Sequence, residues 1–286
     1  MNKIAIVTGA SSGIGLSTST ALAALGHHVV MVCRDRDRGQ AAEEAVAARA
    51  SGPAPSLLIA DLASQAQIRA LAQEIQLRFP AIDILINNAG ASFSERELTD
   101  DGVERTFAVN VLAPFLLTNL LLDTLKATSP SRVVMVGSEI HAGKLDFDNL
   151  QGEHRYGFLK AYKASKLANL LLAYELARRV AGTPGLTVNS VSPGPARTGF
   201  GDNMHGLPMR FSKIMKRTPM FAKPTKAARG PLYLATSPDV QGISGRFYLR
   251  TKPKDSKKIS YDPAVAARLW IICDQLTSTN VHGIAR

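Results

Sequence analysis

Cysteine is scarce in this chain, which has only Cys33 and Cys273 among its 286 residues. Two cysteines are too few for a disulfide scaffold or for a zinc site with four ligands. We therefore interpret both as unpaired thiols in a reducing compartment, and we predict no metal site.

Long uninterrupted apolar runs are also missing. The most apolar stretch, residues 109–125, is broken by Pro114 and by several polar residues, whereas a membrane-spanning helix needs about 20 nearly uninterrupted apolar residues. The N-terminal MNKIAIVTGA reaches Thr8 and Gly9 too soon to contain the apolar core of a secretory signal. We therefore predict no transmembrane segment and a cytoplasmic protein.

Acidic residues are outnumbered, because 34 Lys and Arg oppose 23 Asp and Glu and give a formal net charge of +11. Such an excess fits nucleic acid, a membrane surface or an anionic small ligand. The charge is concentrated in residues 203–238, which contain seven Lys or Arg and no acid. A nucleic-acid groove would instead interleave cations with stacking aromatics, so we predict no nucleic-acid partner.

A regular alternation of short apolar runs and longer helical patterns is what the chain does have. The runs are KIAIVTG, HVVMVC, SLLIADL, DILINNAG, RVVMVGS and LTVNSVSPG. This order indicates βαβ units, whose strands form a parallel sheet with helices on both faces. We expect one α/β domain over residues 1–286, a doubly wound sheet of about seven strands. Because the alternation lapses after Gly194, we interpret the basic residues 199–238 as a lid-like insertion.

A glycine-rich turn, TGASSGIG at residues 8–15, follows the first strand and precedes a helical pattern. Its glycines allow a tight turn and let a pyrophosphate approach the free N–H groups at a helix N-terminus. The same letters contain G-x-S-x-G, the pattern of a hydrolase nucleophile elbow. Because no acid and histidine complete a hydrolase triad, we favour nucleotide binding.

Polar residues follow the later strands: NNAG at residues 87–90, and Ser138 just after the fifth strand, with Asn110 in a helical pattern between them. Ligands bind beyond the carboxyl ends of parallel strands, so these side chains should gather at one edge. Tyr162 and Lys166, four residues apart, share one helix face. A nearby ammonium lowers the pKa of a phenol, so we interpret the pair as an acid/base, although Y-x-x-x-K alone is common in ordinary helices.

These motifs, with PGPART at residues 193–198, occur in the order and spacing of the short-chain dehydrogenases/reductases, and the chain resembles that family over essentially its whole length. The resemblance implies a Rossmann fold and hydride transfer with a nicotinamide cofactor. It makes Tyr162 the proton donor to a carbonyl, or the acceptor from an alcohol, with Lys166 lowering its pKa. Ser138 would bond the substrate oxygen, and Asn110 would hold a water that links Lys166 to solvent.

The resemblance also implies which residues contact the cofactor. The diphosphate turn would be lined by Gly9, Ser11, Ser12, Gly13, Ile14 and Gly15. The other contacts would be Asp61 and Leu62 at the adenine; Asn88, Ala89 and Gly90 at the ribose; Lys166, with Tyr162 beside it, at the nicotinamide ribose; and Pro193, Gly194 and Thr198 at the nicotinamide.

Two departures from the family pattern are visible. Gly137 stands where many members have another serine, which should matter little because Ser138 aligns with the catalytic one. The segment from Ser138 to Tyr162 is longer than is common by roughly ten residues. With LANLL after Lys166 and SPDVQGISGRFY near the C-terminus, the chain looks most like the retinol dehydrogenase and protochlorophyllide reductase branch. That placement implies NADPH and a hydrophobic carbonyl or alcohol substrate.

Three other functions are open at this point. A non-catalytic NADP-sensing regulator should have lost Tyr162 or Lys166, and both are present. An NADPH-dependent reductase of a conjugated C=C bond is a second alternative. A sugar-nucleotide epimerase or dehydratase is disfavoured by the glycine spacing and the short C-terminal region.

The most informative absence is an acid at the end of the second strand, VVMVCRDRDR. NAD-preferring members of the family carry an aspartate there, whereas this chain has Cys33 followed by Arg34. A carboxylate would repel a 2′-phosphate, while Arg34 can pair with it bidentately. We therefore expect Arg34, with Arg38 or Ser12, to select NADP(H).

Three further segments have more than one interpretation. Glu139 and His141 lie beside Ser138, and for both we favour a solvated loop over substrate contact. Met and Phe among the cations of the lid suit an apolar anionic substrate, a carrier-linked substrate or a membrane surface as readily as a solvated face. The helical patterns PFLLTNLLLDTL and KLANLLLAYELARR are apolar over wide arcs, and such helices commonly form a homodimer or homotetramer interface in this family.

Overall fold

Short runs of β-branched and apolar residues form one sheet in the computed structural model, which describes residues 3–196 and 222–277. The sheet has eight strands in the order β3-β2-β1-β4-β5-β6-β7-β8. The strands are β1 (Ile4–Thr8), β2 (His28–Cys33), β3 (Ser56–Ile59), β4 (Ile84–Asn87), β5 (Ser131–Val136), β6 (Leu186–Ser192), β7 (Phe247–Leu249) and β8 (Lys252–Pro253). The predicted doubly wound α/β fold is confirmed.

The strand order places β1 next to both β2 and β4, so the winding of the chain reverses between β3 and β4. In open parallel sheets, ligands bind beyond the carboxyl ends of the strands at such a reversal. The eighth strand is an addition to the expected seven, and it pairs antiparallel with β7 through Leu249 and Lys252. Its sequence, KP, has no apolar run that could have indicated a strand.

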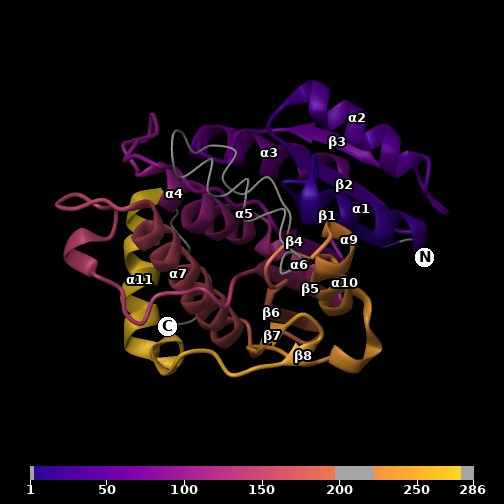
Figure 1. Cartoon of the computed structure of the whole chain (residues 1–286). Coiled ribbons are helices and arrows are strands. Elements are labelled where there is room, and N and C mark those ends of the chain that lie inside the picture. The colour runs from indigo at the N-terminus through magenta and orange to yellow at the C-terminus, as the bar shows by residue number, and fades with distance from the viewer. Residues whose placement is uncertain (1–2, 197–221, 278–286) are drawn as a thin grey trace.

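Helices cover both faces of the sheet, as Figure 1 shows. The major helices are α1 (Gly13–Ala24), α2 (Arg36–Ala47), α3 (Gln65–Arg78), α5 (Ala113–Leu120), α7 (Phe158–Arg179), α10 (Arg229–Thr236) and α11 (Pro263–Thr277). Shorter ones are α4 (Arg105–Phe107), the π-helical η1 (Ala108–Leu112), α6 (Leu122–Ala127), η2 (Phe147–Asn149), α9 (Pro224–Ala227), η3 (Pro238–Val240) and η4 (Lys258–Tyr261). Ile84 and Ile86 of β4 pack toward α1, α2 and α10, and Leu85 packs toward α3, α5 and α7. A strand buried on both sides needs the continuous apolar run that the sequence shows.

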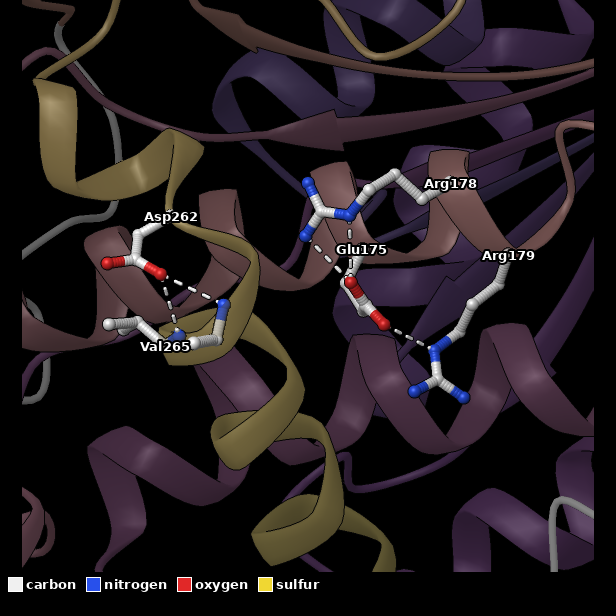
Figure 2. Close-up of polar contacts among 6 residues, drawn as sticks. Glu175, Arg178, Arg179, Asp262 and Val265 are labelled. Carbon is white, nitrogen blue, oxygen red and sulfur yellow. Dashed lines mark hydrogen bonds and ion pairs between the residues drawn. The ribbon is translucent and has the colours of Figure 1, made fainter. Parts of the chain in front are cut away.

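The C-terminal helix α11 lies against α7 and η1, outside the main helix layer (Figure 1). Its Trp270 meets Phe115 of α5 edge to face, with ring centroids 4.8 Å apart, and the Arg179 guanidinium lies 4.3 Å from the Trp270 ring. Glu175 binds both Arg178 and Arg179 at 2.7 Å, and Asp262 caps the start of α11 (Figure 2). Part of the apolar surface of α5 and α7 is therefore covered by α11 of the same chain. The homodimer or homotetramer stays a prediction.

The long connection between Ser138 and Tyr162 folds away from the sheet edge and is anchored to residues 91–105. The Tyr156 hydroxyl donates to the Phe93 carbonyl at 2.9 Å, and the Glu104 backbone N–H donates to Gln151 Oε1 at 2.9 Å. The connection also packs Leu145 and Phe147 against the main core.

The basic segment that was interpreted as a lid lies partly outside the described residues, because 197–221 are not described. Of the remainder, α9 contacts α1, and α10 packs on β5 and β6, where Leu234 and Ala235 are buried. The lid over residues 199–238, and its contact with an anionic substrate, therefore stay predictions.

Candidate active site

Ser138 and Tyr162 come together beyond the carboxyl end of β5. The Ser138 hydroxyl hydrogen-bonds the Tyr162 phenol, and it also accepts from the Ile140 N–H at 3.1 Å. A hydroxyl has one proton and two acceptor lone pairs, so Ser138 can accept from Ile140 and bond the phenol at the same time. Both Ser138 and Tyr162 are half-buried residues.

Lys166 lies behind Tyr162 and is 6% exposed. Its ammonium donates to the Val136 carbonyl at 3.2 Å and lies 5.7 Å from the centroid of the Tyr162 ring. Burial disfavours the charged amine and lowers the pKa of Lys166 to about 8. An amine with that pKa can give up and regain a proton near neutral pH.

The pKa of Tyr162 differs from the sequence-based expectation. The nearby ammonium was expected to lower it, but burial raises the pKa of the phenol, opposed by the Ser138 hydroxyl. Burial is the largest influence on the phenol, while the Lys166 ammonium is directed at the Val136 carbonyl. In this arrangement Ser138 is the group that favours the phenolate.

Asn110 lies in the π-helical turn η1, an irregularity often found at functional sites. Its side-chain oxygen accepts from Ala91 N at 2.8 Å, and its amide donates to Ala91 O and to Ser165 Oγ, both at 2.9 Å. Ser165 in turn donates to the Tyr162 carbonyl at 2.8 Å. The side chain of Asn110 therefore connects the NNAG loop to the helix that carries Tyr162. The backbone carbonyl oxygen of Asn110 accepts from the Asn169 side-chain amide at 3.2 Å, and the water expected at Asn110 stays a prediction.

The glycine-rich turn is shaped by contacts that exclude side chains. Gly9 has φ +66, and a Cβ atom on Gly15 would lie 2.1 Å from the Gly9 carbonyl oxygen. Asn88 supports the turn from β4, because its amide donates to the Thr8 and Gly9 carbonyls at 2.8 and 3.3 Å. Thr8 Oγ1 accepts from the backbone N–H groups of Asn88 and Ala89 at 3.0 Å. Asn88 and Ala89 thus lie beside the turn, and their contact with a ribose stays a prediction.

The N-terminus of α1 fits a diphosphate. Among the described residues, no side-chain hydrogen bond from Ser12 caps this helix, and its first turn has no acidic residue. The predicted contacts Ser11, Ser12, Gly13 and Ile14 are all half-buried. Backbone N–H groups at such an end attract an anion, and the helix dipole adds to that attraction.

The end of β2 presents cations and a neutral thiol. Cys33 is buried, and its thiol hydrogen-bonds Ser11 and the Ala10 backbone, with burial raising its pKa to about 11. Arg34 and Arg38 are exposed just beyond it. The neighbouring carboxylate, Asp35, is committed to capping α2 through the Arg38 N–H at 2.9 Å. The surroundings of Arg34 therefore suit an anionic group.

The remaining predicted cofactor contacts lie at the ends of β3, β4 and β6. Asp61 accepts from Ala63 N at 2.9 Å, and Asp61 and Leu62 are half-buried. Gly90 is exposed, and a Cβ atom there would lie 3.4 Å from both Asn110 Oδ1 and Lys166 Nζ. Pro193 is buried and Gly194 has φ +77. Thr198 lies outside the described residues.

Several residues that support the site were missed by the sequence analysis. Ser192 Oγ accepts from Glu139 N at 3.1 Å and from Gly194 N at 3.3 Å, so it connects two of the loops. Thr8 and Ser165 also connect segments of the site, and their positions inside the TG and YKASK motifs were the available signal. The interpretation of His141 as a solvated loop residue is wrong, because this side chain is 6% exposed.

Gly137 leaves room for a neighbouring side chain. A Cβ atom on Gly137 would lie 2.9 Å from Ser190 Oγ, which explains the glycine there.

The comparisons with known proteins agree with this geometry. Residues 3–205 match the short chain dehydrogenase family. Retinol dehydrogenase 14 from Homo sapiens is 41% identical over 288 residues, which cover 95% of this chain and 85% of that protein. The structure of an uncharacterised protein from Mycobacterium paratuberculosis is 30% identical and has a TM-score of 0.77, covering 97% of this chain and 94% of that one.

A short chain dehydrogenase from Burkholderia cenocepacia, solved in complex with NADP, is 25% identical and has a TM-score of 0.67. The match covers 88% of this chain and 97% of that one.

The prediction of a cytoplasmic protein is wrong. The retinol dehydrogenases to which the chain is similar are associated with microsomal membranes. In residues 3–196 and 222–277, no helix is long and apolar enough to cross a membrane.

Proposed function

The chain belongs to the short chain dehydrogenase family, an oxidoreductase family that binds nicotinamide cofactors, and from that premise we propose that it interconverts a hydrophobic carbonyl compound and its alcohol with NADP(H). The observation that carries this proposal is the hydrogen bond between Ser138 and Tyr162, with Lys166 buried behind the phenol. A regulator without catalysis would have no need to keep these three groups together.

In the proposed reduction, Tyr162 gives its phenolic proton to the carbonyl oxygen as the C–H bond forms at the carbonyl carbon. A bound NADPH supplies the hydride for that bond. Ser138 bonds the substrate oxygen where negative charge develops, and it stabilises the phenolate that Tyr162 becomes. Lys166, whose pKa is about 8, returns a proton to Tyr162. In alcohol oxidation each of these proton transfers runs in reverse.

Apolar side chains at the mouth of the site support a hydrophobic substrate. Ile140, two residues after Ser138, is 54% exposed, and Leu159, one helical turn before Tyr162, is 48% exposed. Exposed apolar side chains so close in the chain to Ser138 and Tyr162 suit an apolar ligand that would cover them. The similarity to retinol dehydrogenase 14, named for an apolar alcohol, points the same way.

The preference for NADP(H) rests on the end of β2. Arg34 and Arg38 are exposed there, and Asp35 is turned to the α2 backbone. A 2′-phosphate could pair with these two guanidinium groups, because the Asp35 carboxylate already accepts from the Arg38 backbone N–H. The uncapped N-terminus of α1 would hold the diphosphate.

The test is to follow NADPH absorbance while the full-length protein is mixed with a panel of aldehydes, ketones and quinones, including apolar polyene aldehydes. We expect turnover with apolar carbonyls and little with short polar ones. Tyr162→Phe is the matched control, because it removes the reacting hydroxyl and keeps the ring. Absence of turnover with every carbonyl, or full turnover by Tyr162→Phe, would contradict the proposal.

A further inference from the structure

The loop that carries Ser138 is held by a distant part of the chain. Residues 252–261, here called the strap, run from β8 to η4 along the lower edge of the molecule in Figure 1. The Lys257 ammonium donates to the His141 carbonyl at 2.7 Å, and Lys254 forms an ion pair with Glu139. The strap and the Ser138 loop are therefore joined on both sides of Ile140.

His141 is the buried centre of this junction. Its Nδ1 lies 3.0 Å from the Ser138 carbonyl oxygen, and its Nε2 lies 3.4 Å from the Lys257 backbone N. A carbonyl can only accept and a backbone N–H can only donate, so both contacts require a neutral imidazole with its proton on Nδ1. The edge of the ring also meets Phe247 of β7, at 6.3 Å between centroids.

The strap is itself firmly attached to α7. Ser256 Oγ lies 2.9 Å from the Tyr174 hydroxyl and 2.6 Å from Ser260 Oγ, and the Ser256 N–H donates to the Tyr261 hydroxyl at 3.1 Å. The rings of Tyr174 and Tyr261 stack at 5.1 Å. Because α7 also carries Tyr162, the strap links the two halves of the reactive pair through a second route.

We propose that His141 is a positioning residue, which holds the Ser138 backbone in place for the Tyr162 phenol as long as its imidazole is neutral. This inference rests on the proposed function, because Ser138 is taken as the residue that bonds the substrate oxygen. The role belongs to the N–H on Nδ1 and to the acceptor on Nε2, and the ring itself does not touch substrate.

The charges around His141 favour the neutral form. Burial lowers the pKa of the imidazole, the Ser138 carbonyl opposes that, and the cations Lys257 and Lys254 outnumber Glu139. Because the folded pKa lies below the ordinary value of about 6.5, the strap contact is intact above that pH and is lost as pH falls through the lowered pKa. Protonation would place a second N–H on Nε2, facing the Lys257 N–H.

The first experiment compares His141→Phe with His141→Asn in the full-length protein. Asparagine carries an N–H donor at the same number of bonds from Cα as Nδ1, whereas phenylalanine carries none. We expect His141→Phe to lower kcat roughly tenfold with the KM for NADPH unchanged, and His141→Asn to recover most of that loss. The exposed His154→Phe, in the same long connection, is the control and should match the wild type. Equal kcat for His141→Phe and wild type, or an equal loss in both variants, would overturn the inference.

The second experiment uses pH. Wild-type kcat should fall on the acid side of pH 6.5 through the His141 titration, and His141→Asn should lack that step. Identical acid limbs in the two proteins would overturn the role given to the neutral imidazole.

The third experiment does not depend on turnover, so it separates this inference from the proposed function. Hydrogen–deuterium exchange of residues 138–142 should be slow in wild type and faster in His141→Phe. Lys257→Met removes the ammonium bond and keeps the alkyl stem. If His141→Phe fails to fold, Lys257→Met serves in its place, and exchange of residues 138–142 should be faster in it than in wild type. A protein that turns over no carbonyl would contradict the proposed function alone, whereas unchanged exchange in both variants would overturn the positioning role.

Discussion

The turn after β1 and the loop after β5 lie at the same edge of the sheet but are built in opposite ways. At the turn, groups that would meet the cofactor are backbone N–H groups, exposed because glycine omits side chains. At the loop, the groups proposed to react are the side chains of Ser138, Tyr162 and Lys166, which lie together. Cofactor binding at the turn should therefore weaken when an atom is added, whereas catalysis at the loop should slow when an atom is removed.

Removing one atom from the catalytic side should have the largest effect. Tyr162→Phe deletes only the hydroxyl, and loss of a general acid typically reduces rate by about 10²–10⁴-fold. We expect kcat to fall by that factor while NADPH affinity, measured by cofactor fluorescence, stays within about twofold. An unchanged kcat would show that another group supplies the proton.

Adding one atom to the cofactor side should come next. In Gly15→Ala the new Cβ would lie 2.1 Å from Gly9 O and 2.6 Å from Asn88 Nδ2, so the turn must shift. Overpacking of this kind costs about 1–3 kcal/mol, and we expect NADPH affinity to fall roughly 10- to 100-fold. Gly182→Ala is the control, because a Cβ there has no neighbour within 4 Å. Equal NADPH affinities of Gly15→Ala and Gly182→Ala would contradict the role given to the glycine turn.

Charge at the end of β2 should have a smaller effect, limited to cofactor choice. Arg34→Ala removes an exposed guanidinium, and a charge-assisted hydrogen bond contributes about 1.5–3 kcal/mol. We expect the ratio of kcat/KM for NADPH over NADH to fall roughly tenfold, since exposure weakens the interaction. Arg49→Ala, two residues past the C-terminal end of α2, should leave that ratio unchanged. Equal efficiency of wild type with both cofactors would remove the basis for NADP(H) selection.

Removing the Lys166 charge should raise stability, a sign opposite to its effect on activity. Burial of the Lys166 charge lowers its pKa to about 8, so the unfolded chain binds more protons between about pH 8 and 10.5 and wild-type stability rises over that window. Lys166→Met lacks this burial cost, so urea unfolding at pH 7 should show a stability gain of roughly 1–3 kcal/mol with activity lost. The gain should disappear toward pH 10.5; a pH-independent difference would contradict the buried charge.

The sequence allowed prediction of the sheet and of the contiguous motifs. Apolar runs buried on both faces indicated the parallel strands, and the spacing of Tyr162 and Lys166 placed both on one helix. The cofactor turn was equally accessible, because its requirement for Gly9 and Gly15 is local. The burial of single side chains could not be predicted in the same way. His141 was interpreted as solvated because its partner Lys257 lies 116 residues further along the chain.

The helix α11 shows the same limit. The sequence correctly indicated that α5 and α7 have more apolar surface than a sheet contact uses, and it suggested a second subunit as the cover. In the structure Trp270 and its neighbours on α11 cover part of that surface from the same chain. An apolar stripe specifies that it will be buried, but it does not specify by which partner.

By itself the sequence determined the alternation of strands and helices from β1 to β6, the glycine turn, the candidate reacting residues and the missing acid after β2. Each of these is encoded in neighbouring residues. Only the tertiary structure decided the protonation tendencies of Tyr162 and Lys166 and the attachment of the Ser138 loop to the strap. Those properties depend on desolvation and on hydrogen bonds between segments distant in sequence, which no local pattern records.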